Sequence, residues 1–94
     1  MNNEQPTITK GQKVYYARIL PSVDIYDVND LIIRTVADDY FTGMDKHDKH
    51  AFLFTYSDIG NIIFFNRSEA LEKVLQAEEN RKVKTTNEKY YEEY

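Results

Sequence analysis

The 94-residue chain contains no cysteine and no tryptophan, and it has only three glycines and two prolines. Without cysteine, the fold cannot depend on disulfides or thiolate metal sites, and thiol catalysis is excluded. The longest apolar stretches, such as residues 62–65, are far shorter than the roughly 20 residues that a membrane-spanning helix needs. The first ten residues are polar and lack an apolar signal segment. We therefore expect a cytoplasmic protein in a reducing compartment, with no membrane contact.

Patterns that bind phosphate or support nucleophilic catalysis are also missing. Gly11, Gly43 and Gly60 lie too far apart to form a glycine-rich phosphate loop, and no serine has a nucleophile-elbow context. Asp38 and Asp39 are adjacent, so on a strand they would point to opposite faces rather than pair for acid–base work. We predict that the protein is not an enzyme and binds no cofactor.

Acidic residues outnumber basic ones by 16 to 12, which gives a net charge of −4. Between residues 19 and 65 all eight acids are aspartates, against three basic residues. Nucleic-acid binders usually carry a basic face, so this balance favours a protein partner with a basic surface and makes nucleic acid an unlikely one. Aspartates also favour turns, and their simplest role is to mark solvated loops. The candidate partner-binding aspartates are Asp24, Asp27, Asp30, Asp45 and Asp48.

The first two thirds of the chain predict β-structure. Segments with strand-like composition or alternation are residues 13–20, 31–36, 40–44, 50–56 and 62–65. Residues 22–30 contain three aspartates and an asparagine, and we expect a loop there. Phe54 lies in the middle of the clearest strand and should be buried.

A helix should follow the strands. Asn66 can cap a helix, with Glu69 three residues later as in a capping box. The apolar stripe expected to face the sheet comprises Ala70, Leu71, Val74 and Leu75. We predict an α+β, mainly β, fold: a small five-stranded antiparallel SH3-like barrel with one C-terminal helix. The alternative is an open antiparallel sheet with the helix packed across one face.

The segment from Asp45 to His50 (DKHDKH) holds both histidines of the chain and two carboxylates, which are ligand types for zinc or nickel. Lys46 and Lys49 interleave with them and would repel a cation. We therefore expect a solvated hairpin tip without a metal ion. Residues 24–30 lack the ligand spacing of an EF-hand, so no calcium site is predicted there.

Three sections divide the chain: a flexible leader over residues 1–10, a single barrel-plus-helix domain over 11–82, and an acidic, tyrosine-rich tail over 83–94. Tyr90, Tyr91 and Tyr94 have helical spacing, and tyrosine is enriched at protein interfaces. They form either part of a binding surface or a final turn packed on the barrel.

Two stretches carry a resemblance to other proteins. One begins at Gly11 and reads GQKVYY, and the other covers residues 57–70 and reads SDIGNIIFFNRSEA. The second resembles a recurring pattern in small uncharacterised proteins of Firmicutes and their phages and prophages. In that pattern an aspartate-x-glycine turn precedes a Val-Phe strand and an Arg-x-Glu-Ala helix start. Here Ile63 replaces the usual valine and Asn66 a common threonine, and the resemblance covers residues 11–75.

The resemblance implies a phage or mobile-element context and attaches no enzymatic activity. Small acidic proteins from that context often bind a host protein, and they include inhibitors of host defence such as anti-CRISPR proteins. We therefore expect a non-enzymatic binding protein that engages or inhibits a host protein. The alternative is a small-barrel nucleic-acid-binding accessory factor, for which Lys13, Tyr15, Tyr16 and Arg18 are the basic and aromatic candidates.

Overall fold

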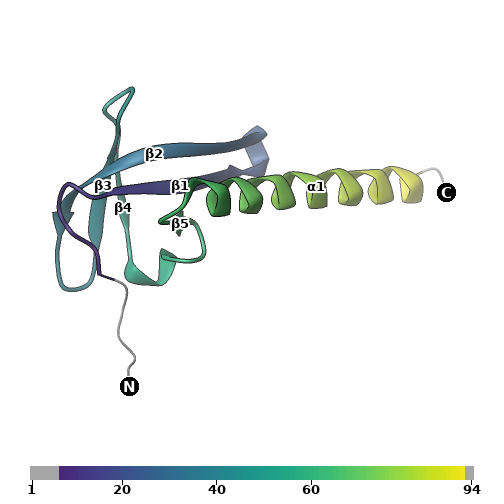
Figure 1. Ribbon diagram of the computed structural model, residues 1–94. Coiled ribbons are helices and arrows are strands. Elements are labelled where there is room, and N and C mark those ends of the chain that lie inside the picture. Colours follow the sequence, from purple (N-terminus) through teal and green to yellow (C-terminus); the bar gives the residue numbers. More distant parts are fainter. Residues whose placement is uncertain (1–6, 93–94) are drawn as a thin grey trace, which may run out of the picture.

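The computed structural model describes the backbone of residues 7–92 and the side chains of residues 7–81 (Figure 1). Its strands are β1 (Lys13–Leu20), β2 (Ile25–Val36), β3 (Phe41–Asp45), β4 (Ala51–Phe54) and β5 (Ile63–Phe64). Two 3₁₀ turns, Pro21–Val23 and Tyr56–Asp58, separate β1 from β2 and β4 from β5. One helix, α1 (Arg67–Glu92), ends the described chain.

The strands form one antiparallel sheet in the order β4-β3-β2-β1-β5. The sheet bends so strongly that its two outer strands meet over the same core, where Phe54 of β4 and Ile63 of β5 belong to one buried cluster. The structure thus confirms the prediction of a small five-stranded antiparallel barrel with one C-terminal helix.

Strands β1 and β2 form a long hairpin that projects from the barrel, here called the arm (Figure 1). Its register pairs Lys13 with Ile32 and Leu20 with Ile25. The prediction of a loop over residues 22–30 is therefore wrong, because β2 already begins at Ile25. Pairing with β1 overrides the low strand propensity of the aspartates there.

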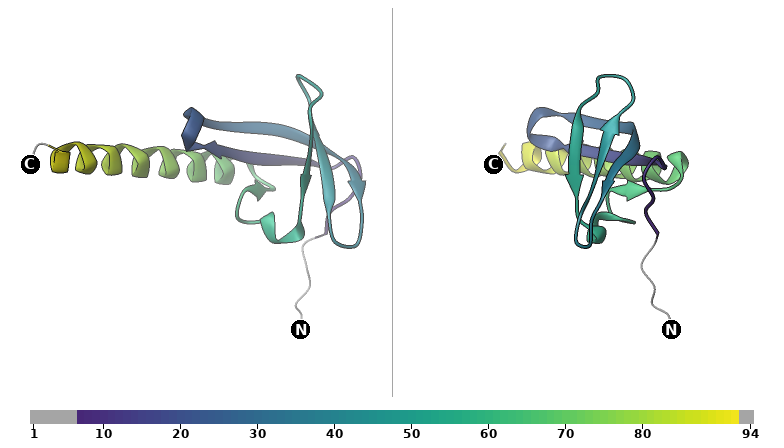
Figure 2. Two further views of the ribbon diagram at one scale, coloured as in Figure 1. Left: turned by 180° about the vertical axis from the view of Figure 1, so that it is seen from behind. Right: turned by 90° about the vertical axis from the view of Figure 1, so that its left-hand side faces the viewer.

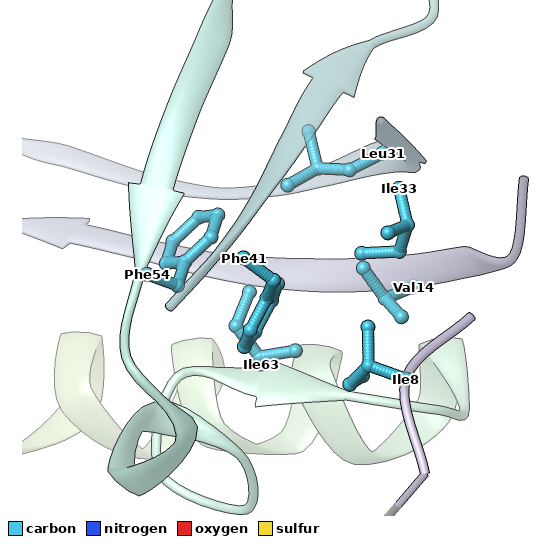
Figure 3. Packing of buried hydrophobic residues seen from close by; sticks show 7 residues of the cluster. All are labelled: Ile8, Val14, Leu31, Ile33, Phe41, Phe54 and Ile63. Carbon is cyan, nitrogen blue, oxygen red and sulfur yellow. The ribbon is translucent and has the colours of Figure 1, made fainter. Parts of the chain in front are cut away.

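The barrel core consists of large side chains that point toward one another (Figure 3). Its buried members are Ile8, Val14, Leu31, Ile33, Phe41, Phe54 and Ile63. Phe54 is 3% exposed, as predicted.

Ile8 is an unexpected member of this core, because we expected residues 1–10 to be a flexible leader. It is 7% exposed, and the segment that follows it is tied to β2 by two hydrogen bonds. The Gly11 N–H donates to the Ile33 carbonyl and the Ile33 N–H to the Gln12 carbonyl, both at 2.8 Å. The expectation is wrong for this part of the leader, since burying an isoleucine favours a fixed chain.

The helix covers the face of the arm that lies opposite the barrel core (Figure 2). Ala17 of β1 and Ala70 and Val74 of α1 are buried there in a second, smaller cluster. Leu71 and Leu75, in contrast, are 38% and 55% exposed, so the predicted stripe is wrong for both. The helix buries the face on which its small residues meet Ala17.

Beyond this contact, α1 continues past the tip of the arm to Glu92 and crosses the predicted boundary at residue 82 (Figure 1). Within the described residues, no helix is both long and apolar enough to cross a membrane.

Candidate protein-binding surface

One face of the arm meets strand β4 at a partly exposed cluster of aromatic and charged side chains. The Arg18 guanidinium lies 5.7 Å from the centre of the Phe52 ring. The His50 ring stacks on the same phenylalanine at 6.2 Å, and its Nδ1 lies 3.7 Å from the Asp48 carboxylate. Leu20 and Asp27 share the face of the arm on which Arg18 lies, because the register pairs Arg18 with Asp27 and Leu20 is two residues further along β1. We call this set the corner surface: Arg18, Leu20, Asp27, Asp48, His50 and Phe52.

On its inner side, the Phe52 ring packs against the barrel core. Tyr16 packs edge-on against it at 5.3 Å and against Phe54 at 5.0 Å. Such edge-to-face pairs fix ring orientation as well as burying area. Phe52 therefore belongs partly to the core and partly to the surface, and its position is set before any partner arrives.

The Asp27 carboxylate is exposed at the edge of this surface. Arg18 is its cross-strand partner, and opposite charges in this position commonly pair. The guanidinium instead lies over Phe52, and no ion pair within 4 Å joins the two side chains, both of which are described. The negative charge of Asp27 is thus available to a partner.

Asp45, in contrast, is only 3% exposed. Its Oδ2 accepts a hydrogen bond from Asn29 Nδ2 at 2.8 Å, and its Oδ1 accepts from the backbone N–H groups of His47 and Asp48. The Asn29 hydrogen bond is the main cause that lowers the pKa of Asp45, supported by the two backbone donors and by the charge of His47, while burial opposes the shift.

Asp45 is therefore a buried carboxylate rather than an exposed one, and its contact with a partner stays a prediction. It joins the arm, through Asn29, to the turn that carries Asp48 and His50. This hydrogen bond fixes the arm, which carries Arg18 and Asp27, relative to the turn that carries Asp48 and His50.

The remaining predicted aspartates do not share one face. Asp24 lies in the turn of the arm, where its carboxylate is 3.4 Å from Arg81 of α1. Asp30 is half-buried and pairs with Tyr15 on the face that α1 covers. Of the predicted aspartates, only Asp27 and Asp48 belong to the corner surface.

The tyrosine tail lies mostly outside the described residues. Tyr90 and Tyr91 fall within the backbone of α1, but their side chains are not among those described, and Tyr94 lies beyond them. Their role as an interface stays a prediction.

Two open hollows lie elsewhere on the described surface. One, of about 410 Å³, is lined by Gly60, Phe64, Glu69, Glu72, Lys73 and Gln76. The other, of about 470 Å³, is lined by Lys10, Arg34, Thr35, Thr42, Met44 and Ala51. The second hollow contains no carboxylate or histidine, and the first places Glu69, Glu72 and Lys73 together along the surface of α1. Among the described side chains, no three carboxylates or histidines gather as metal ligands.

In comparisons with known proteins, no protein family, no curated protein and no solved structure matches the chain.

The sequence analysis did not place Leu20, His50 and Phe52 on the surface that carries Arg18. A signal was present, because Tyr16, Arg18 and Leu20 alternate along one strand and must share a face. What the sequence could not supply was the bend that brings β4 over that face.

Proposed function

We propose that the protein is a non-enzymatic, acidic binding protein of a phage or mobile element that engages or inhibits a host protein in the cytoplasm. The main support is the arm, which α1 braces along one face and which carries the exposed carboxylates of Asp24 and Asp27. Binding residues of small domains usually lie on turns and loops held by a rigid scaffold.

The partner is a host protein with a basic surface, such as the nucleic-acid-binding groove of a CRISPR effector or another defence factor. Carboxylates on a rigid arm would occupy positions that phosphates take in that groove. They would also speed association by electrostatic steering.

The test is capture of host proteins from a lysate, followed by measurement of association rates for the captured partner. Asp24→Asn combined with Asp27→Lys should slow association strongly, because it removes negative charge from the arm. Asparagine suits position 24, where the backbone has φ of 60°. Raising salt from about 50 to 300 mM should slow the unmodified protein and affect this variant much less, since screening shortens the Debye length.

The matched control is Asp38→Asn combined with Asp39→Lys, the same chemical change at two exposed aspartates in the β2–β3 turn. It should leave the association rate unchanged. Equal effects of the two double variants, or association that is indifferent to salt, would overturn the proposal of a charge-recognised partner.

The tyrosine tail is tested separately. A chain that ends after Lys82 lacks Tyr90, Tyr91 and Tyr94 but retains both buried clusters. If the tail belongs to the interface, partner binding should fall while the melting temperature stays constant. A large fall in melting temperature would instead assign the tail a structural role.

A nucleic-acid accessory factor is the second candidate, and the contact of Arg18 with Phe52 favours it. Arginine and aromatic rings stack on bases, even where sequence is not read. The flanking carboxylates of Asp27 and Asp48 disfavour it, since they would repel phosphates. Assaying captured nucleic acid in the same lysate experiment separates the two candidates.

A further inference from the structure

The hollow of about 470 Å³ on the outer face of β2 and β3 differs in charge from the acidic chain that surrounds it. The residues that line it include two cations, Lys10 and Arg34, and two hydroxyl groups, those of Thr35 and Thr42, but no carboxylate. Among the described side chains, no carboxylate lies within 4 Å of either cation. The hollow therefore offers hydrogen-bond donors and positive charge without a counter-ion of its own.

A β-bulge brings Arg34 and Thr35 to the same side of the sheet. In the β2–β3 register, Ile33 pairs with Gly43 and Thr35 pairs with Thr42. Arg34 is therefore the extra residue of β2. Consecutive strand residues normally point to opposite faces, whereas Arg34 and Thr35 both line the hollow. Bulges re-aim side chains in this way and are frequent next to functional sites.

The segment before β1 fixes the position of Lys10 at the hollow. Lys10 lies in a turn that two hydrogen bonds close, from the Gln12 N–H to the Thr9 carbonyl at 3.0 Å and from the Thr9 N–H to Gln12 Oε1 at 2.9 Å. The burial of Ile8 holds the chain on the other side of this turn. Because the backbone is already ordered, only the Lys10 side chain has to be immobilised when a ligand arrives.

From this arrangement we propose that the hollow binds the phosphate monoester of a small organic molecule. The phosphate group contacts Lys10 and Arg34, and the organic part lies against Met44. Arginine presents a planar fork of donors that suits phosphate oxygens, and lysine adds a point charge. Arg34 Nη1 lies 3.4 Å from the Met44 sulfur, so the guanidinium and the apolar surface adjoin.

The charges of the hollow favour a monoester. A phosphate monoester carries nearly two negative charges at neutral pH, which match the two cations. Each phosphodiester of a nucleic-acid backbone carries only one. The volume also lies within the range of small-molecule sites, about 300–1,000 Å³.

The charges around the hollow favour a small ligand over a polyanion. Asp38 and Asp39 follow β2 in the next turn, and the turn between β3 and β4 carries Asp48 beside Lys46 and Lys49. None of these side chains lines the hollow. A long nucleic acid would extend beyond it and meet a chain with a net charge of −4, whereas a small ester would not.

The experiment titrates the nitrogen-labelled full chain with phenyl phosphate at constant ionic strength and follows the amide chemical shifts. We expect saturable shifts at Lys10, Arg34, Thr35 and Thr42. Inorganic phosphate should shift the same amides but bind more weakly, because it lacks a ring to contact Met44. Arg34→Gln should raise the dissociation constant for phenyl phosphate at least about tenfold, since it removes the charged fork.

The matched control is Arg67→Gln, the same chemical change at an exposed arginine that begins α1 and does not line the hollow. It should leave the dissociation constant unchanged. Thr42→Val keeps the shape of the side chain and removes one hydroxyl, and it should weaken binding severalfold. Arg34 and Thr42 lie outside both buried clusters, so these variants should fold, and the amide spectrum of each verifies it.

Several results would overturn the proposal: no saturable shift at these amides, equal losses for Arg34→Gln and Arg67→Gln, or unchanged binding by Thr42→Val, which would assign the attraction to charge alone. A short oligothymidine without a terminal phosphate offers only diesters, and a phosphoserine peptide offers a monoester on a protein segment. Tighter binding of either probe than of phenyl phosphate would overturn the choice of a small ester.

This inference goes beyond the proposed function and does not depend on it. The hollow lies at the end of β2 away from Asp24 and Asp27, whose charges the capture experiment tests. Arg34→Gln should therefore leave the capture of a host protein unchanged, so either proposal can fail while the other stands.

Discussion

The barrel and the arm–helix layer are both held by buried residues, but of very different size. In the barrel, the fully buried side chains include Phe41, Leu31 and Ile33. In the layer between the arm and α1, the buried side chains are Ala17, Ala70 and Val74. Because transfer free energy scales with the apolar area removed from water, the barrel holds most of the stability. Small residues contribute little area but let helix and strand backbones approach closely.

This difference separates two roles within one short chain. The barrel keeps the protein folded, whereas the thin layer beneath α1 supports the arm that carries Arg18, Leu20 and Asp27. Substitutions in the two regions should therefore differ in how much they lower the free energy of unfolding and in which part of the molecule they disturb.

The largest effect is expected in the barrel. Phe54→Ala should lower the free energy of unfolding by about 3–5 kcal/mol, since it leaves a cavity beside Phe41 and Tyr16. Chemical denaturation measures this loss. A loss below about 1 kcal/mol would mean that the barrel is not the stable region.

Asp45, which joins the two regions, should come next. Asp45→Asn should cost about 1–3 kcal/mol near neutral pH, because it disrupts a buried acceptor of three hydrogen bonds. Since folding lowers the pKa of Asp45, its ionised form stabilises the fold above the unfolded value of about 3.9, and this contribution is lost as pH falls through the folded pKa.

The stability difference between the unmodified chain and Asp45→Asn should therefore shrink as pH falls below about 4. Denaturation curves over a pH series measure it, with Asp39→Asn as an exposed control. A difference that stays constant down to acid pH would contradict the role given to the carboxylate.

A smaller effect is expected beneath the helix. Val74→Ala should cost about 1–2 kcal/mol, because it removes two methyl groups from a shallow cluster. Hydrogen exchange should quicken in the arm and in the first turns of α1, while the amides of β3 remain protected. Uniform quickening over the barrel would show that the two regions unfold as one.

The smallest effect concerns the tip of the arm. Arg81→Gln should change stability by no more than about 0.5 kcal/mol, since the ion pair with Asp24 is solvent-exposed. Thermal melts at low and high salt should be nearly superimposable for the variant and the unmodified chain. A clear loss at low salt would show that this contact, too, fixes the arm.

The sequence predicted the barrel better than the arm. The first strand, 13–20, has the bounds of β1, and Asn66 directly precedes α1. The first half of β2 was missed because its aspartates resemble a turn, although in the sheet Asp27 simply faces solvent. The strand expected over 50–56 ends at Phe54, since Thr55 and Asp58 cap a 3₁₀ turn through reciprocal hydrogen bonds.

The orientation of α1 shows why residue spacing alone could not predict which face of the helix is buried. Ala70 with Val74 and Leu71 with Leu75 have the same four-residue spacing, so periodicity cannot choose between the pairs. The close approach of α1 to Ala17 decides it, and that approach depends on contacts far apart in the sequence. The corner surface was missed for the same reason, because Arg18 and Phe52 meet only after the sheet bends.

The burial of Ile8 has a practical consequence for anyone who handles this chain. A protease that cuts between Ile8 and Gly11 would separate the Ile8 side chain from the rest of the barrel core, although Gly11 and Gln12 would stay on the fragment that pairs with Ile33. Truncations that remove Ile8 should therefore destabilise the barrel. Limited proteolysis at this segment would therefore report on the integrity of the barrel.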